Sequence, residues 1–459
     1  MTEFTIRLAN RPGMLAALTE RLDAAGVHVE ALAAFGYSED GHVRMIVDDA
    51  ETAARVLEEA GLVSEEREVL TTVLPNTTGS LAGLTRRLAD SGVNIEALYV
   101  LKSHAEGLEL AIAVDELAAA RSGLGFGLIS CQTVAGDNRG WEEWYAEALD
   151  LVVELEHRGF RSVWTTEHHF VDDGYMPSLL VTSAAMAART ERILIGTGVV
   201  LAPLHHPLRL AEDAATVALI SRNRLLLGLG LGWSEIEFDA FGADIHRRGA
   251  AMNEVLSILS SAWGGEPFHH DGRVYSLPPV AIRPVPTSPV PVYIGAGAAA
   301  GVRRAARLAD GFFSNAPFDA FLEQVRVGRE ELEKAGRDPA SFQWSWYSSL
   351  YVSDDPRRGL EELAPHLHAM TWKYRDMGES ASRPGGPAVP PPYDPAQAER
   401  LGGRAMIGTG EQIAERLGEL EDTAGVPIDF VARSYFPTMG REQQWEVVGR
   451  LAGDVLPHL

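Results

Sequence analysis

Three polar residues, Glu167, His168 and His169, follow directly on the apolar segment Val163–Thr166. Carboxylate and imidazole groups in this pattern suit either proton transfer or metal binding. Adjacent side chains on a strand point to opposite faces, so the two histidines are poorly placed to ligate one ion. No other cluster in the sequence has the spacing of metal ligands. The pattern therefore favours acid–base chemistry and no metal site.

Two glycine-rich segments could approach a phosphate group closely. They read G-L-G-L-G at 228–232 and G-A-G-A-A-A-G at 295–301. Neither is a dinucleotide fingerprint, because the glycine spacing is wrong and the strand expected at 311–315 ends without an acidic residue. We therefore expect no nicotinamide-binding domain.

A single arginine, Arg433, stands in the apolar segment F-V-A-R-S-Y near the end of the chain. It could face a site and hold an anion, or pair with an acid in a structural role. Four aromatic residues could either line a pocket or pack in the core: Trp141, Trp144, Trp233 and Tyr175.

The segments that carry these residues alternate between strand and helix patterns from residue 125 onward. Several of the strand segments are uniformly apolar, which is typical of parallel strands covered on both faces. Eight such strands with intervening helices predict a (β/α)8 TIM barrel within the α/β class, over residues 124–459. Two insertions stand out, a hairpin at 265–285 and a Gly/Pro-rich segment at 378–395 that we expect to be a mobile lid. The strands are expected at 125–130, 162–168, 192–201, 224–231, 290–296, 311–315, 343–352 and 429–435, and the helices that follow them include 141–158, 298–309 and 356–372.

The barrel sequence resembles the bacterial luciferase-like flavin monooxygenases. The resemblance rests on V-W-T-T-E-H-H-F-V-D-D-G-Y, I-L-I-G-T-G-V-V-L-A-P-L-H-H-P-L, S-R-N-R-L-L-L-G-L-G-L-G-W and V-P-V-Y-I-G-A-G, in family order, and it spans about residues 125–459. It implies that His168 acts beside a reduced flavin, with Glu167 supporting it, and that the strand bends under the flavin through a non-proline cis peptide. The cofactor-binding residues implied are Thr197, Gly198, Val199, Gly228, Gly230, Gly295, Gly297, Ala298 and Arg433.

The sequence departs from luciferase itself at two places. Gly230 and Leu231 replace a reactive cysteine and an arginine, and Gly297 and Ala298 replace an acid and a serine. We therefore expect a monooxygenase that does not emit light and holds phosphate mainly through backbone amides at a helix N-terminus. Such an enzyme would oxygenate a small organic substrate with reduced FMN from a separate flavin reductase. The alternatives are a deazaflavin-dependent oxidoreductase of the same fold and a non-catalytic regulatory protein that binds flavin or amino acids.

The N-terminal residues contain an internal repeat. Residues 13–32 and 79–98 match at 12 of 20 positions with a constant offset of 66. Each copy predicts strands and helices in βαββαβ order, a ferredoxin-like unit. The sequence of the repeat resembles the ACT domain. This resemblance implies that residues 1–119 are a tandem ACT module that binds an amino-acid effector or serves only for dimerisation. Its candidate effector-binding residues are Asn10, Gly13, Val27, Asn76, Gly79 and Asn94.

Composition limits the partners. The 459 residues carry 40 basic and 64 acidic side chains, a formal charge of −24. This charge argues against nucleic acid or an anionic membrane as a partner. The single cysteine, Cys131, cannot form an internal disulfide, and no signal peptide or membrane span is visible. We expect a cytoplasmic homo-oligomer, a dimer or a tetramer.

Overall fold

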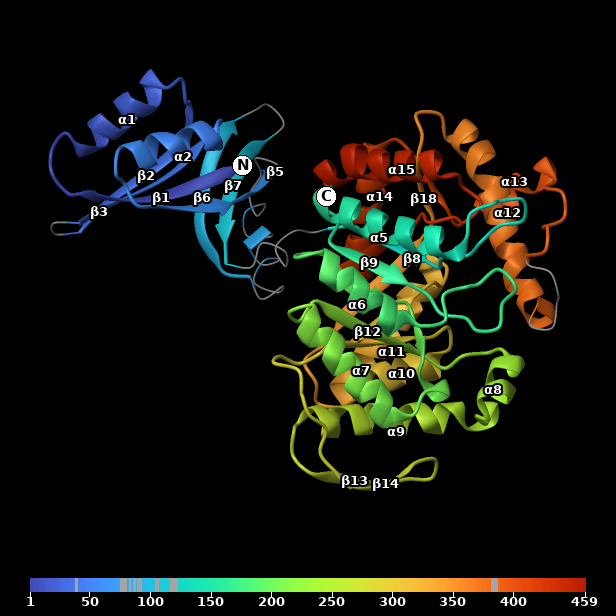
Figure 1. Cartoon of the computed structure of the whole chain (residues 1–459). Helices are drawn as coiled ribbons and strands as arrows, with labels where there is room; N and C mark the ends of the chain where they lie inside the picture. The colour runs from blue at the N-terminus through green and yellow to red at the C-terminus, as the bar shows by residue number, and fades with distance from the viewer. Residues whose placement is uncertain are drawn as a thin grey trace. The chain divides into compact units, whose positions relative to one another are not determined.

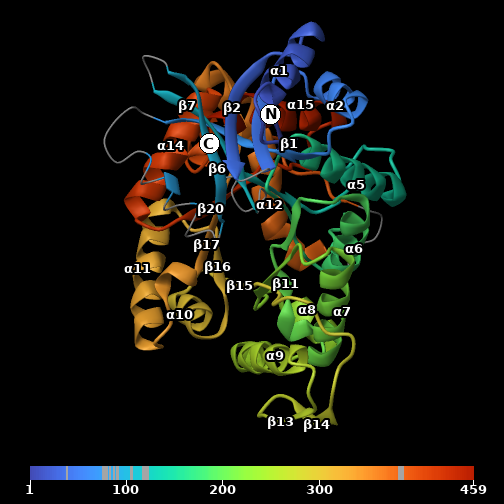
Figure 2. The same cartoon turned by 90° about the vertical axis from the view of Figure 1, so that its left-hand side faces the viewer.

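A computed structural model shows two compact units, Met1–Arg121 and Ser122–Leu459, each of which is described by itself below (Figures 1 and 2). No helix among the described residues is long and apolar enough to cross a membrane. The structure describes residues 1–37, 40–74, 93–103, 107–115, 123–380 and 387–459, together with Leu81, Leu84, Thr85 and Leu88.

The first repeat forms an antiparallel sheet with two helices. The sheet order is β2-β3-β1-β4, which matches the ferredoxin-like arrangement that the sequence predicts. Leu18 and Leu22 of α1 are buried against this sheet, whereas Leu15 at the start of the predicted apolar stripe is exposed. The elements are β1 (Thr2–Ala9), α1 (Met14–Ala24), β2 (Val29–Tyr37), β3 (Asp40–Val47), α2 (Ala50–Glu59) and β4 (Ser64–Glu68).

The second repeat contributes a three-stranded antiparallel sheet in the order β5-β7-β6. Its strands are β5 (Leu70–Leu74), β6 (Ile95–Ser103) and β7 (Leu108–Val114). Both repeats end their first helical segment in the same way, since Val27 N donates to Leu22 O at 2.9 Å and Val93 N donates to Leu88 O at 2.9 Å. The repeat in the sequence is therefore accompanied by a repeated backbone hydrogen bond among the described residues.

The second unit contains a closed barrel of eight parallel strands. Neighbouring strands pair in chain order, and the ring closes where β10 pairs with β12 at Ile195–Leu225 and Gly196–Leu226. A short strand, β11 (Val200–Leu201), pairs with the later residues Leu229 and Gly230 of β12. The predicted TIM barrel is thus confirmed. The barrel strands are β8 (Gly125–Ile129), β9 (Ser162–Thr165), β10 (Leu194–Thr197), β12 (Leu225–Gly230), β15 (Val292–Gly295), β16 (Gly311–Ser314), β17 (Gln343–Ser348) and β20 (Ile428–Arg433).

Aromatic side chains fill the barrel interior. Trp164 stacks on Phe313 with ring centroids 4.5 Å apart, and Phe313 contacts Tyr347 at 4.9 Å. Gly196 gives Trp164 its room, because a Cβ at this glycine would lie 2.4 Å from the indole ring. The interior is therefore a packed core that leaves chemistry to the strand ends.

Helices and short strands surround the barrel (Figures 1 and 2). The predicted hairpin is β13 (Phe268–Asp271) and β14 (Ser276–Val280), whose turn is held by the carboxylate of Glu254 on α9. The helices are α5 (Trp141–His157), α6 (Leu179–Arg189), α7 (Pro207–Ile220), α8 (Glu235–Phe241), α9 (Arg248–Trp263), α10 (Ala299–Leu308), α11 (Phe318–Lys334), α12 (Pro356–Ser380), α13 (Ala398–Gly402), α14 (Gly410–Ala424) and α15 (Arg441–Arg450), and the two remaining strands are β18 (Leu350–Val352) and β19 (Met406–Gly408).

One predicted boundary is wrong. The helix expected at 356–372 continues as α12 to Ser380, so the first residues of the predicted lid, 378–380, are helical. The helix continues because Lys373 and Met377 extend its buried face beyond residue 372. Residues 381–386 of the predicted lid lie outside the described residues, and residues 387–395 contact α12, where His368 Nε2 lies 2.9 Å from Pro391 O.

Candidate active site

His168 lies at the C-terminal mouth of the barrel, in the loop that follows β9. Its backbone amide donates to Met176 O at 3.3 Å, so the loop folds back on itself at this residue. The side chain is 6% exposed and is surrounded by aromatic rings. The ring centroids of Tyr175, Trp233 and Tyr374 lie 4.9, 5.8 and 5.9 Å from that of His168. The imidazole is thus confined in one orientation.

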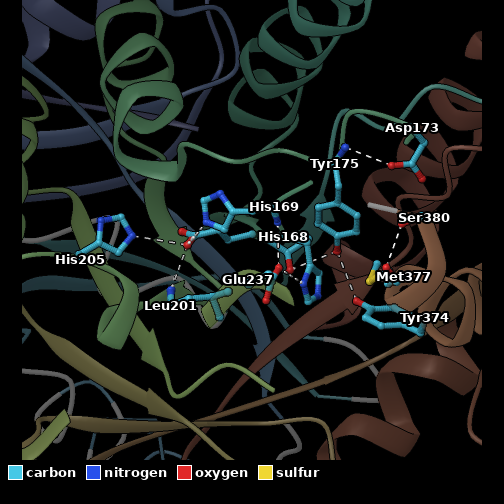
Figure 3. Close-up of polar contacts among 12 residues, drawn as sticks. His168, His169, Asp173, Tyr175, Leu201, His205, Glu237, Tyr374, Met377 and Ser380 are labelled. Atoms are coloured by element: carbon cyan, nitrogen blue, oxygen red, sulfur yellow. Dashed lines mark hydrogen bonds and ion pairs between the residues drawn. The ribbon is translucent and has the colours of Figure 1, made fainter. Parts of the chain in front are cut away.

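Glu237 of α8 holds the imidazole. Its Oε1 lies 3.0 Å from His168 Nδ1 and also accepts the backbone amide of His169 at 2.9 Å (Figure 3). An ionised carboxylate only accepts hydrogen bonds, so Nδ1 carries a proton and Nε2 is the nitrogen left for chemistry. Glu237 is 1% exposed, and its Oε2 has no hydrogen-bond partner among the described residues.

Sequence reasoning missed Glu237 because the short helix α8 was not predicted. A signal was available: Ser234 precedes Glu235 and Glu237, and a serine followed by acidic residues is typical of a helix N-terminus. The pairing with His168 spans 69 positions and two barrel strands, so no local pattern could indicate it.

Glu167 faces away from His168 and has its own partners. Its Oε1 lies 3.0 Å from His169 Nε2 and 3.5 Å from His205 Nε2, and it accepts the Leu201 amide at 3.3 Å. Burial alone would raise the pKa of Glu167, but the two histidines outweigh it and the pKa falls below its ordinary value. The carboxylate that supports His168 through a direct hydrogen bond is therefore Glu237.

The strand bend that the resemblance implied is present. The Gly198–Val199 peptide is cis, directly after β10. Thr197 is buried and exchanges two 2.9 Å hydrogen bonds with the backbone of Gly228, so its hydroxyl is fully used inside the barrel.

Three of the predicted cofactor glycines make room for protein atoms. A Cβ at Gly230 or Gly295 would lie 2.3 or 2.7 Å from the Val199 side chain, and a Cβ at Gly228 would lie 1.9 Å from Thr197 O. These glycines accommodate the bend. A cofactor above the bend would meet Val199 itself, which is only partly buried.

Gly297 and Ala298 lie at an open helix start. Both are exposed, and a Cβ at Gly297 would have no neighbour within 4 Å. Ala298 is the N-cap of α10 and offers no side-chain hydrogen bond to the first-turn amides, and no acidic residue occupies that turn. The N-terminus of α10 can therefore receive an anion through its backbone amides.

Comparison with known proteins places this barrel in a family. The family described as luciferase-like monooxygenase matches residues 126–426. This chain belongs to that family.

Two curated relatives of this chain have names that point to different cofactors. An F420-dependent glucose-6-phosphate dehydrogenase of Nakamurella multipartita is 34% identical over 231 residues, 47% of this chain and 67% of that protein. The oxygenase component of a flavin-dependent trigonelline monooxygenase of Acinetobacter baylyi is 29% identical over 152 residues, 33% of this chain and 42% of that protein. The chain therefore spans between 42% and 67% of the length of these two relatives.

Solved structures agree on the fold. The monooxygenase RslO1 of Streptomyces bottropensis has a TM-score of 0.62 at 22% identity, covering 73% of this chain and 98% of that one. An F420-dependent secondary alcohol dehydrogenase has a TM-score of 0.55 at 17% identity and covers 72% of this chain and 98% of that one.

In this luciferase-like barrel, Arg433 ends β20 and lies among tyrosines. Its guanidinium lies 5.8 Å from the ring centre of Tyr347 and 5.5 Å from that of Tyr374, and Nη2 donates to Tyr374 Oη at 3.0 Å. No carboxylate pairs with Arg433 among residues 123–380 and 387–459 or elsewhere in the described chain. The sequence left two roles open for Arg433, holding an anion or pairing with an acid. The described residues contain no such ion pair.

A buried ion cluster fixes α12 to the loop that carries His168. Lys373 pairs with Asp172, with Asp173 at 3.3 Å and with Asp376 at 3.6 Å. Asp173 also receives 2.7 Å and 3.1 Å hydrogen bonds from the side chain of Gln132 and the amide of Tyr175. The cluster brings Tyr374 to Tyr175, whose hydroxyl oxygens lie 3.3 Å apart (Figure 3).

The other aromatic candidates divide between core and mouth. Trp144 is 3% exposed and belongs to the core, with Arg139 lying over its ring. Trp141 and Trp233 are 59% and 50% exposed. Of the three tryptophans, Trp233 is the one whose ring lies near His168, with the centroids 5.8 Å apart.

The predicted effector residues occupy different environments in the N-terminal unit. Val27 is buried in the core of the first repeat, so it cannot line an open site there. Gly13 is the N-cap of α1 at φ +91°, and Asn10 is exposed at the end of β1. The backbone N–H of the exposed Asn94 donates to the Asp115 carboxylate at 2.8 Å. The backbone N–H of His28 donates in the same way to the Asp48 carboxylate in the first repeat. Asn76 and Gly79 lie outside the described residues.

Proposed function

We propose that this protein is an FMN-dependent, two-component monooxygenase in which His168 transfers protons beside the reduced flavin. The observation that carries the proposal is the His168–Glu237 pair at the barrel mouth. The Glu237 carboxylate fixes the proton on Nδ1 and leaves Nε2 as the ring nitrogen that can accept a proton.

The mouth fits a flavin in two respects. Val199 would contact the ring system, and the exposed amides of Gly297, Ala298 and the first turn of α10 would hold its phosphate. When bound in reduced form, flavin would supply the electrons with which oxygen is activated. The confined, aromatic surroundings of His168 would keep water away from the reacting centre.

The proposal also includes a separate flavin reductase. A curated relative is named as the oxygenase component of a flavin-dependent monooxygenase, a name that supports a two-component system. The barrel has no dinucleotide fingerprint with which to bind NADH itself. We therefore expect purified protein to be nearly colourless and to bind reduced FMN more tightly than oxidised FMN.

A deazaflavin-dependent oxidoreductase is the second candidate. Its support is the 34% identity to an F420-dependent dehydrogenase, which uses the same family fold. In that reaction His168 would accept a proton from the substrate while a hydride passes to the deazaflavin. The two candidates differ in their need for oxygen.

Oxygen incorporation separates the two candidates. The wild-type protein is incubated with enzymatically reduced FMN, 18O2 and a panel of amines, amino acids and aldehydes, and in parallel without oxygen with F420 and a panel of alcohols and sugar phosphates. Labelled oxygen in an organic product supports the monooxygenase. Reduction of F420 without oxygen uptake, and no labelled product, would replace it by the alternative.

We further propose that residues 1–119 regulate or assemble the enzyme as a tandem ACT module. The support is the sequence repeat together with one backbone hydrogen bond that occurs in both copies, from Val27 N to Leu22 O and from Val93 N to Leu88 O. The test compares the full chain with a variant lacking residues 1–119 in size by light scattering and in kinetics with each amino acid. An unchanged oligomeric state, together with kinetics that no amino acid alters, would contradict both roles.

A further inference from the structure

Arg433 places a positive charge in the barrel mouth without an acidic partner. Its described contacts are the hydroxyl of Tyr374 and the rings of Tyr347 and Tyr374. A guanidinium has five N–H donors, and the hydrogen bond to Tyr374 uses only one of them. Arg433 is partly buried, and partial burial of a cation without a counter-charge has a free-energy cost that ring contacts return only in part. The site is therefore incomplete without an anion.

The tyrosines around Arg433 do not supply that anion. Burial raises the pKa of Tyr347 to about 12 and the pKa of Tyr175 well above its ordinary value. Both hydroxyls are consequently protonated near pH 7. The three acidic residues of the neighbouring ion cluster, Asp172, Asp173 and Asp376, pair with Lys373 and form no ion pair with Arg433.

Arg433 lies three strands along the barrel rim from each of the two features that fit a flavin. Arg433 and Tyr347 end the eighth and seventh barrel strands, whereas Val199 follows the third and Gly297 follows the fifth. In a closed ring of eight strands the greatest separation is four, so Arg433 is well separated along the rim from both Val199 and Gly297. His168 follows the second strand, and its ring contacts Tyr374, the same residue that binds Arg433.

We propose that Arg433, with the Tyr374 hydroxyl, is the anion subsite of the substrate pocket, so that the substrate is an organic anion. A carboxylate, sulfonate or phosphate monoester would accept two parallel hydrogen bonds from the guanidinium. The remainder of such a substrate would extend past Tyr374 toward His168. The inference rests on the proposed function only for where the cofactor lies, and anion binding can be measured without any cofactor.

The test measures ligand affinity of the full chain by saturation-transfer NMR, with no cofactor and no turnover. The probes are benzoate, benzenesulfonate and phenyl phosphate, with benzamide and benzyl alcohol as neutral counterparts. We expect at least one anion to bind the wild type, and Arg433→Met to weaken it at least about tenfold, while Arg433→Lys weakens it less. The matched control is Arg441→Met, because the Arg441 guanidinium also lies on a ring, that of Trp445, at 5.6 Å, but on α15.

Reduced and oxidised FMN are titrated against the same variants. FMN affinity unchanged by Arg433→Met, together with weakened anion binding, supports the substrate subsite. Weaker FMN binding with unchanged binding of the probes would instead assign Arg433 to the cofactor phosphate. Failure of all three anions to bind the wild type would also overturn the inference, whatever cofactor the enzyme uses.

A folding defect in Arg433→Met would be seen by circular dichroism. In that case Tyr374→Phe serves as the second variant, since it removes the hydroxyl that Arg433 binds and keeps the ring. We expect it to weaken the same anion about threefold. An unchanged affinity in both Tyr374→Phe and Arg433→Lys would contradict the assignment.

Discussion

Two buried carboxylates, one in each unit, contrast in how fully their surroundings satisfy them. In the N-terminal unit, Glu3 of β1 is fully buried and receives a bidentate pair of hydrogen bonds from Arg44 at 2.8 and 2.7 Å, and another from Tyr99 of β6. In the barrel, Glu237 uses a single oxygen for His168 and His169 and leaves its second oxygen without a described partner. The first carboxylate has a cationic partner, and the second has an imidazole with one open nitrogen.

The two carboxylates therefore serve different purposes, Glu3 stabilising the fold and Glu237 positioning a reactive side chain. A closed, charge-balanced network joins the two repeats of the N-terminal unit and has no free group for a reaction. An open pair holds His168 in one tautomer and orientation but leaves a proton-accepting atom at the barrel mouth. We therefore expect changes at Glu3 to alter stability and changes at His168 or Glu237 to alter turnover.

The largest expected effect follows from removing the imidazole. His168→Ala should lower turnover ~100-fold or more, the usual scale for losing a positioned acid–base group. The measurement is the rate of organic product formation, with circular dichroism to confirm the fold. His269→Ala, an exposed histidine on the β13–β14 hairpin, is the control. Full activity in His168→Ala would refute the assignment.

Removing the carboxylate of the closed network should have the next largest effect. Glu3→Ala leaves Arg44 and Tyr99 without their shared acceptor, and we expect a loss of about 2 kcal/mol, reduced from the buried-pair range because Arg44 is 19% exposed. Hydrogen–deuterium exchange of β1 and β3 measures it. Asp40→Ala, which breaks the exposed Arg7–Asp40 pair between the same strands, should cost much less stability, because solvent screens an exposed pair. Equal losses of stability in both variants would mean that burial of the carboxylate does not determine how much its ion pair stabilises the sheet.

Neutralising the carboxylate of the open pair should have a smaller effect on turnover than removing the imidazole. Glu237→Gln keeps the volume but supplies a weaker acceptor, so we expect about a tenfold loss of turnover, roughly 1.4 kcal/mol, and a changed pH profile. Asp239→Asn, an exposed acid on the same helix, is the matched control. A pH profile identical to that of the wild type would show that Glu237 is only structural.

The one effect that is expected to vanish at neutral pH is a pH dependence of stability at α12. Burial lowers the pKa of His366 to about 4, and its Nδ1 lies 2.7 Å from Thr438 Oγ1. Because the folded state binds fewer protons than the unfolded chain, the free energy of unfolding should fall as pH drops from about 6.5 to about 4 and be constant above. Urea denaturation across this range measures it. His366→Asn should flatten this part of the curve, and a persistent slope would assign it to another group.

The sequence was sufficient for the architecture but not for the pairings at the mouth. Apolar strand runs and helical spacing predict all eight barrel strands, because burial on both faces leaves a continuous local signal. The family motif also leads to His168 and to the bend at Gly198–Val199. Glu237 and Tyr374 could not be found in this way, since each reaches His168 through a contact between segments far apart in the chain. The same holds for Glu167, whose adjacency to His168 in sequence suggested a support that the geometry gives to Glu237.

The most direct test of the open pair is the protonation of the His168 ring itself. Protein labelled with 15N-histidine is studied by long-range 1H–15N correlation, and His168 is assigned from the spectrum of His168→Ala. The structure predicts that the proton of the neutral His168 ring lies on Nδ1, which donates it to Glu237 Oε1, and that Nε2 carries none. A neutral His168 whose proton resides on Nε2 would contradict the pairing with Glu237 and the role proposed for it.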